Sequence, residues 1–170
     1  ILEFLITYGL RAGEIANLKL DDINWREETL CIVQRKNGKP LELPLMPVVG
    51  KLLVQYLKYA RPAVVHREIF LRHMAPIKPL QSGGITCCVR RYLKRAGLDH
   101  IHGGAHLFRH TFATNLCSQG VPLKHIGDLL GHKSCESTQL YTKTNIPNLC
   151  GIALEAPYLK GDKKNEKFRV

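Results

Sequence analysis

A histidine and an arginine stand three residues apart in the run HLFRH, in the second half of the chain. On a helix, side chains at this spacing project from one face, so His106 and Arg109 are expected to lie together. A guanidinium there can bind two phosphate oxygens at once. Cutting a phosphodiester with a side-chain hydroxyl also needs a nucleophile and an acid for the leaving oxygen. The pair therefore points to part of a site for phosphate-ester chemistry.

Motifs at fixed offsets follow this pair: an H-x-x-R-H-T-F-A-T run, an L-L-G-H turn and a tyrosine nine residues after the histidine of that turn. The segment from His106 to Tyr141 resembles the signature of the tyrosine recombinase, or phage integrase, family. The block YGLRAGEIANLKLDDIN resembles the family's first-arginine motif, G-L-R-x-x-E-x-x-x-L, and the run VQRKNGKPLELPL resembles its β-ribbon. Together these blocks span Tyr8–Thr144.

The resemblance implies a site-specific DNA recombinase or integrase, which cuts and rejoins DNA strands through a 3′-phosphotyrosyl link. It implies no cofactor and no metal, because the covalent link conserves the energy of the phosphodiester. The catalytic residues that it assigns are Arg11, Lys36, His106, Arg109, His132 and Tyr141.

Each assigned residue has a role in the implied reaction. Tyr141 attacks the phosphorus, and because a free tyrosine has a pKa near 10, it needs help at neutral pH. His106 is the candidate acceptor of its proton. Arg11 and Arg109 hold the transferring phosphoryl oxygens, and His132 donates a further hydrogen bond.

Glu14 follows Arg11 by three residues. At this spacing its carboxylate would orient the guanidinium, although an exposed ion pair has the same spacing. The sequence leaves both interpretations open.

The β-ribbon is predicted from two β-prone runs, Thr29–Gln34 and Leu41–Met46. They flank Asn37-Gly38, the dipeptide best suited to a type I′ hairpin turn. Lys36 and Lys39 then lie at the tip. The resemblance makes Lys36 the acid that protonates the departing 5′-oxygen, and Lys39, close to it on the same turn, is an expected DNA contact.

Apolar spacing and capping residues predict the other elements. We expect helices over Ile1–Tyr8, Gly13–Leu20, Pro47–Ala60, Ser82–Ala96 capped by Ser82 and closed by Gly97, Ala105–Gln119 closed by Gly120, a helix that starts at Pro122 and ends at Gly131, one from Ser134 to about Asn145, and a short edge strand at Glu68–Arg72. The resemblance implies the same α+β class: the mainly α-helical catalytic domain of DNA breaking-rejoining enzymes, with a small antiparallel β-sheet.

The domain assignment follows from these blocks. Residues 1–147 form the expected catalytic domain, and residues 148–170 form a carboxy-terminal segment, a possible arm exchanged between protomers followed by a flexible tail. The opening helix has no N-cap before it, which indicates that more chain precedes it. The amino-terminal, DNA-clamping core-binding domain usual in the family is absent from this sequence.

Charge favours a polyanionic partner. The formal net charge is +11 over 170 residues, and the pI is near 9.6, so double-stranded DNA is the expected partner. Four cations share the predicted helix over Ser82–Ala96: Arg90, Arg91, Lys94 and Arg95. Their removal is expected to weaken DNA binding without touching the chemistry, unless they form only a solvated face. The resemblance adds a second partner, the chain itself, in a synaptic tetramer on two DNA sites.

Other classes of protein fit less well. No apolar run reaches the length of a membrane span, and neither a membrane partner nor a signal peptide is expected. The six cysteines lack a C-x-x-C pair, which favours reduced thiols in a cytoplasmic protein. His106 and His110 stand four apart without the glutamate of the zincin motif, and the carboxylate cluster of a metallonuclease is missing. The main rival is a non-catalytic DNA-binding module, in which Pro122–Thr144 forms a helix-turn-helix.

Overall fold

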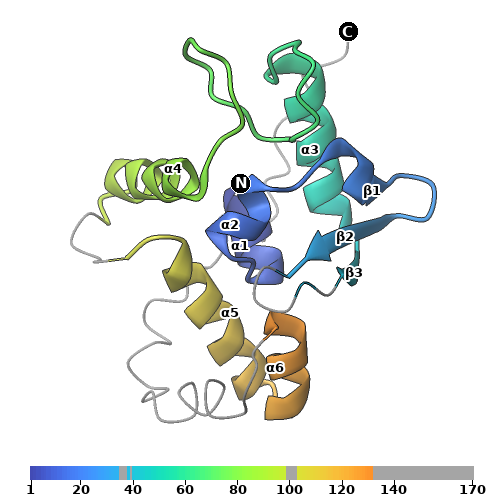
Figure 1. Ribbon diagram of the computed structural model, residues 1–170. Coiled ribbons are helices and arrows are strands. Elements are labelled where there is room, and N and C mark those ends of the chain that lie inside the picture. Colours follow the sequence, from blue (N-terminus) through green and yellow to red (C-terminus); the bar gives the residue numbers. More distant parts are fainter. Residues whose placement is uncertain (35–37, 39, 99–102, 132–170) are drawn as a thin grey trace, which may run out of the picture.

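The computed structural model describes residues 1–34, 38, 40–98 and 103–131, and it shows a mainly helical domain with one small sheet. In Figure 1, α1 and α2 occupy the centre of the view, with α4 on one side and the sheet with α3 on the other. α5 and α6 pack against each other below them. The expected class, α+β with a small antiparallel sheet, is confirmed.

The short elements come first in the chain, and the longer helices follow them. The helices are α1 (Leu2–Tyr8), α2 (Ala12–Ala16), α3 (Pro47–Tyr59), α4 (Ser82–Arg95), α5 (Ala105–Ser118) and α6 (Leu123–Leu130), and a 3-10 turn occupies Leu20–Asp22. The strands are β1 (Ile23–Asn24), β2 (Thr29–Val33) and β3 (Pro40–Pro44). Among the described residues, no helix is long and apolar enough to cross a membrane.

The sheet is antiparallel with β2 in the centre, and β2 pairs with β3 from Thr29↔Pro44 to Val33↔Pro40. β3 is therefore an edge strand, where prolines are tolerated. A two-residue turn at Asn37-Gly38 would pair Val33 with Glu42. The observed pairing of Val33 with Pro40 overturns that predicted turn. The ladder instead stops at Val33, and the N–H of Gly38 donates to the carbonyl of Gln34 at 2.8 Å, which closes a longer turn.

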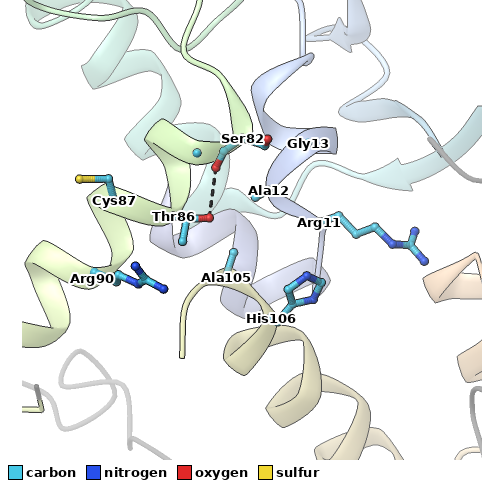
Figure 2. Close-up of a pocket in the computed structure, with 10 residues that line it drawn as sticks. Arg11, Ala12, Gly13, Ser82, Thr86, Cys87, Arg90, Ala105 and His106 are labelled. Atoms are coloured by element: carbon cyan, nitrogen blue, oxygen red, sulfur yellow. Dashed lines mark hydrogen bonds between the residues drawn. The ribbon is translucent and has the colours of Figure 1, made fainter. Parts of the chain in front are cut away.

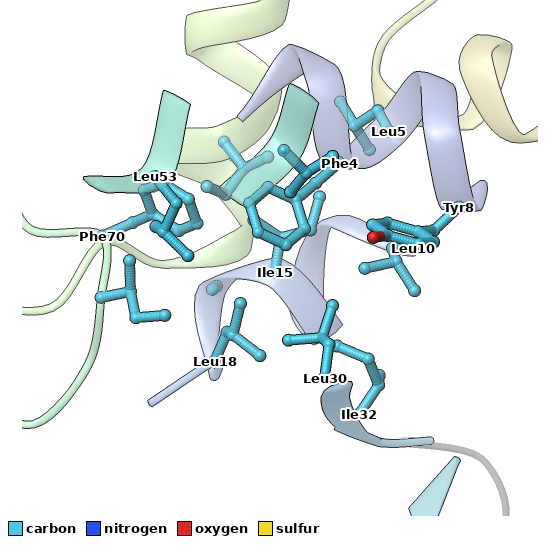
Figure 3. Packing of buried hydrophobic residues seen from close by; sticks show 14 of the residues in the cluster. Phe4, Leu5, Tyr8, Leu10, Ile15, Leu18, Leu30, Ile32, Leu53 and Phe70 are labelled. Atoms are coloured by element: carbon cyan, nitrogen blue, oxygen red, sulfur yellow. The ribbon is translucent and has the colours of Figure 1, made fainter. Parts of the chain in front are cut away.

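One apolar core joins α1, α2, the sheet, α3 and α4 (Figure 3). Its fully buried side chains include Leu5, Ile15, Leu18, Leu30, Ile32, Val49, Ile69, Ile85 and Val89. Each such side chain contributes about 1.5–3 kcal/mol by leaving water. Phe4 packs edge-on against Phe70, with ring centroids 5.8 Å apart. A smaller cluster of Ala113, Ile126 and Leu130 holds α5 to α6.

Tyr8 fixes the end of α1 against the sheet. Its hydroxyl donates to the carbonyl of Pro44 at 2.8 Å and accepts from the N–H of Met46 at 2.9 Å. Gly9 then ends the helix in the left-handed conformation, at φ 60°, which glycine adopts without strain. The chain that leads from α1 to Arg11 therefore starts at a fixed position.

Two expected elements are wrong. The helix predicted over Gly13–Leu20 ends at Ala16, because Leu18 and Leu20 leave it to bond the backbone of residues 67–69. The strand expected at Glu68–Arg72 forms only isolated bridges, Lys19↔Glu68 and Leu71↔Pro79. The residues after Ala16 leave the helix because they pair with residues 67–69, and this pairing yields a single bridge instead of a strand.

The bounds of α3, α4 and α5 lie within one residue of the prediction. Gly97, Gly120 and Gly131 all have positive φ after α4, α5 and α6, as their sequence positions predicted. The starts of α3 and α5 are as predicted, and the caps of α4 and α6 differ by one residue. Gln81, not Ser82, is the N-cap of α4, and Pro122 is the N-cap of α6 and not its first residue.

Candidate active site

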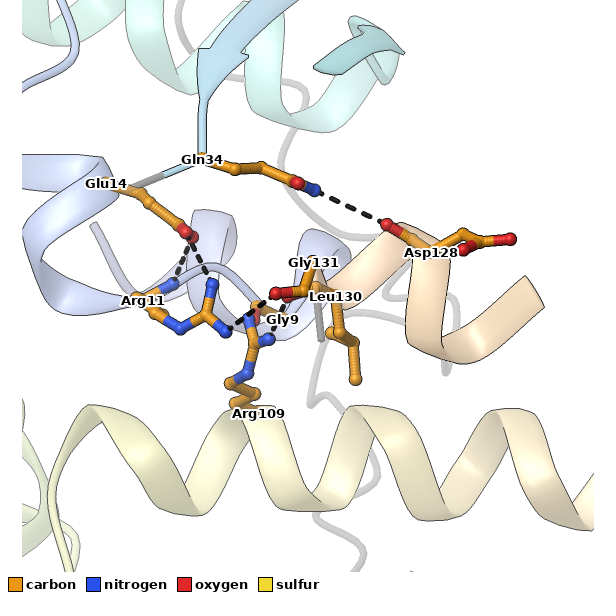
Figure 4. Close-up of polar contacts among 8 residues, drawn as sticks. All are labelled: Gly9, Arg11, Glu14, Gln34, Arg109, Asp128, Leu130 and Gly131. Atoms are coloured by element: carbon orange, nitrogen blue, oxygen red, sulfur yellow. Dashed lines mark hydrogen bonds and ion pairs between the residues drawn. The ribbon is translucent and has the colours of Figure 1, made fainter. Parts of the chain in front are cut away.

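Two arginines from distant parts of the chain meet at the carboxyl end of α6 (Figure 4). Arg109 Nη2 donates to the carbonyl of Leu130, and Arg11 Nη2 donates to that of Gly131, the latter at 3.4 Å. The last carbonyls of a helix have no partner within it, and cations near them are favoured by the helix dipole. The turn that leads into His132 is thus held by two guanidinium groups.

Arg11 is held by Glu14. It is the N-cap of α2, and the Glu14 carboxylate accepts from its main-chain N–H and from its Nη1, each at 2.8 Å. The Glu14 side chain is 3% exposed and that of Arg11 is 20% exposed. This decides between the two interpretations of the spacing: the pair is partly buried, and Glu14 orients Arg11.

Arg109 is more deeply placed than Arg11. It lies on α5 and is 5% exposed, and its Nη1 donates to the carbonyl of Gly9 at 2.9 Å. Since its Nη2 donates to the carbonyl of Leu130, Arg109 bridges the end of α1 to the end of α6.

A pocket of about 570 Å³ opens where α2, α4 and the start of α5 meet (Figure 2). It is lined by Arg11, Ala12, Gly13, Ser82, Gly83, Thr86, Cys87, Arg90, Ala105 and His106. No lining residue is acidic and two are arginines, so the pocket favours an anion. It brings together Arg11 and His106, which are separated by most of the described chain.

The expected shared face of His106 and Arg109 is confirmed only in part. Both lie on α5, but His106 is exposed and lines the pocket, whereas Arg109 is buried and does not. Arg109 instead adjoins Arg11 at the α6 carbonyls. Arg11 therefore takes part in both places: it lines the pocket with His106, and it adjoins Arg109 at the end of α6.

The four cations of α4 divide into two groups. All four side chains are exposed, as a DNA-contacting or a solvated face both require. Only Arg90 lines the pocket, and Figure 2 shows it across Ala105 from His106. Arg91, Lys94 and Arg95 lie outside the pocket, and Arg95 stacks over the ring of Tyr92 at 5.8 Å.

The positive surroundings act on His110, one turn after His106. Its pKa is lowered from the ordinary 6.5, first by burial and then by the charges of His106 and Arg109.

Within the described residues, no group of three or more histidine, cysteine or acidic side chains could hold a metal ion.

Several assigned residues lie outside the described part of the chain. They are Lys36, Lys39, His132 and Tyr141, together with the helix expected from Ser134 and the segment 148–170. The rival helix-turn-helix is described only through its first helix, α6. The roles of these residues stay predictions.

Sequence reasoning missed Gln34, which is 6% exposed and reaches α6. Its side-chain Nε2 donates to the carbonyl of Asp128 at 3.4 Å (Figure 4). A signal was present: Leu30, Ile32 and Gln34 alternate along one face of the strand, and the first two are core residues. A polar residue at the next core-facing position needs a partner.

The fold has clear counterparts among solved structures. It matches the crystal structure of XerA recombinase with a TM-score of 0.73 and 27% identity, over 89% of this chain and 54% of that one. It matches XerH site-specific recombinase, bound to a difH substrate in a post-cleavage complex, with a TM-score of 0.71 and 25% identity, over 89% and 43%. The fold is that of a tyrosine recombinase catalytic domain.

Sequence comparison agrees. Residues 1–146 match the model of the phage integrase family, and the chain belongs to that family. The integrase/recombinase y4gC of Sinorhizobium fredii is 44% identical, over 92% of this chain and 81% of that protein. Tyrosine recombinase XerA of Pyrococcus horikoshii is 32% identical, over 88% and 51%.

The share of each relative that is covered varies. The chain spans most of y4gC, but 37% of the related integrase/recombinase y4rA of Sinorhizobium fredii and about half of XerA. In those longer relatives the matching region is therefore one part of a larger protein.

Proposed function

We propose that this chain carries the catalytic centre of a site-specific DNA recombinase or integrase that works through a 3′-phosphotyrosyl intermediate. The observation that carries the proposal is the placement of Arg11. It shares an anion-favouring pocket with His106 and a helix-terminal turn with Arg109. Arg11 thus adjoins two of the other assigned residues, although both come from a distant segment.

The proposed chemistry is the one that the family resemblance implies for these residues. The phenolic oxygen of Tyr141 attacks the phosphorus and gives its proton to His106, while the bond from phosphorus to the 5′-oxygen breaks. Lys36 gives a proton to that oxygen, and a 5′-hydroxyl leaves. In the reverse step another 5′-hydroxyl attacks, the phosphotyrosyl bond breaks, and the strand is rejoined.

The cations serve the transition state. Charge builds on the non-bridging oxygens during the attack, and fixed donors stabilise it without having to reorganise. Arg11 is pre-oriented by Glu14, and Arg109 by Gly9 and Leu130. Removal of one such donor typically slows the reaction about 10²–10³-fold.

Double-stranded DNA is the proposed partner. The similar XerH structures are complexes with DNA substrates, and the net charge of +11 favours the same class of partner here. We further propose that the protein acts in the cytoplasm and that protomers assemble as a tetramer on two DNA sites.

A covalent adduct tests the proposal. The protein, expressed at the full length that its gene encodes, is incubated with nicked duplexes that tile the DNA flanking the gene. The nick lets the cleaved fragment diffuse away and traps the link. We expect a protein–DNA adduct that survives denaturation and is absent with Tyr141→Phe. Tight binding without an adduct from any duplex would instead favour the helix-turn-helix module.

A further inference from the structure

The side chain of Gln34 is buried at the point where the β-ribbon leaves the sheet. β2 ends at Val33, and Gln34 is 6% exposed. A buried amide without partners destabilises a fold, so the contacts of this side chain matter. Nε2 donates to the carbonyl of Asp128, in the last turn of α6.

Gln34 also fills the space beside Gly131. A Cβ placed on Gly131 would lie 2.6 Å from both Cδ and Oε1 of Gln34, closer than atoms pack. Gly131 has φ 62°, so glycine is favoured there twice, by conformation and by this contact. The fit between the strand end and the helix end is therefore tight.

The main chain of Gln34 makes a further contact. Its carbonyl accepts from the N–H of Gly38 at 2.8 Å and so closes the turn of the ribbon. One residue thus secures the base of the ribbon turn with its backbone and the end of α6 with its side chain.

Two assigned catalytic residues adjoin these contacts in the sequence. Lys36 comes two residues after Gln34, and His132 directly follows Gly131. An anchored ribbon limits the space that a lysine two residues away can sample, which raises its effective concentration at the leaving oxygen.

We propose that Gln34 is a positioning residue for the leaving-group acid, because it ties the ribbon that carries Lys36 to the α6 turn that precedes His132. The inference rests on the proposed function. Removal of the amide should not release α6, which Arg11 and Arg109 still hold through the carbonyls of Gly131 and Leu130. What is lost is the link between ribbon and helix.

The test compares two leaving groups. Gln34→Met keeps the length and burial of the side chain without the donor, and Gln34→Leu is the second variant. Single-turnover cleavage is measured on a nicked duplex from the flanking DNA and on the same duplex with sulfur in place of the bridging 5′-oxygen. A thiolate leaves without protonation, so only the oxygen substrate needs the acid.

We expect Gln34→Met to cleave the oxygen substrate about 10–100-fold more slowly, less than the roughly 10²–10⁴-fold that general acid catalysis contributes, because Lys36 itself is retained. Its rate on the sulfur substrate should stay within about threefold of the parent, a bound that leaves room for small structural effects. Val33→Ala, at a 59% exposed neighbour on β2, serves as the control and should cleave both substrates like the parent.

Three results would overturn the inference. Equal slowing on both substrates, or no slowing, removes the link to the acid. Failure of both Gln34 variants to fold, judged by circular dichroism, makes Gln34 a residue of the scaffold alone. If the parent forms no adduct with either substrate, the proposed function itself fails, and this inference falls with it.

Discussion

The Glu14 carboxylate accepts hydrogen bonds from both the main-chain N–H and the guanidinium of Arg11, each at 2.8 Å. The carboxylate thus fixes the start of α2 and the direction of the side chain together. Because the Glu14 side chain is 3% exposed, water cannot readily take its place, so removal of this carboxylate costs more than removal of one partner of a surface ion pair.

Loss of this carboxylate should affect activity and stability differently. Glu14→Gln keeps an acceptor for the N–H but loses the charge, so we expect cleavage to slow about tenfold, roughly the 1.4 kcal/mol of one lost charge-assisted contact. Glu14→Ala removes both bonds and should lower the free energy of unfolding by about 1–3 kcal/mol. Single-turnover cleavage and urea unfolding measure the two effects. Glu27→Gln, at an exposed carboxylate, is the matched control, and an equal response to it would contradict the role of Glu14.

Gly9 is the second point at which α1 meets the site. Its carbonyl accepts from Arg109, and a Cβ on it would lie 2.5 Å from the ring of Phe112 on α5. Gly120 has a similar backbone, φ 78°, but nothing lies within 4 Å of its Cβ position.

This contrast separates strain from packing. Gly120→Ala should lower the free energy of unfolding by about 1–2 kcal/mol, from the left-handed backbone alone. Gly9→Ala carries the same strain and a clash, which adds about 1–3 kcal/mol. Denaturant unfolding of both variants gives the difference. Equal losses would show that α5 moves away from Gly9 at no cost.

Local patterns predicted most of the helical frame. The bounds of α3, α4 and α5 differ from expectation by one residue at each end at most, because apolar periodicity and terminal glycines act within a few residues. The resemblance supplied Arg11, His106 and Arg109, and the structure places Arg11 beside each of the other two.

Tertiary contacts account for the rest. The segment after Ala16 has a helical pattern, yet it pairs with residues 67–69. Asn37-Gly38 favours a two-residue turn, but Gln34 leaves the ladder to bond Asp128, which lies 94 residues away. The burial of Arg109 was also not legible, since its acceptors on Gly9 and Leu130 are distant in the sequence. A local pattern carries no information on such partners.

Arg90 should differ from its neighbour Arg91 in what it does to DNA. Both are exposed on α4, but Arg90 lines the pocket with Arg11 and His106. Arg91→Ala should only weaken binding and reduce the slope of log K against log salt by about 0.9. Arg90→Ala should do the same and also slow cleavage at saturating DNA. Fluorescence anisotropy over a salt series and single-turnover rates measure this, and identical behaviour of the two variants would contradict a special position for Arg90.

His110 should report the charge of the site through its own titration. Burial, and then the charges of His106 and Arg109, lower its pKa below 6.5. Between the two pKa values the unfolded chain binds more protons than the folded one, so stability is full above pH 6.5 and falls as the pH drops through the folded pKa. NMR titration of the histidine ring signals should place His110 below 6.5. His106→Asn should raise that pKa without restoring it fully, because burial remains the larger cause. A His110 pKa at or above 6.5 would show that the cations of the site do not act on it.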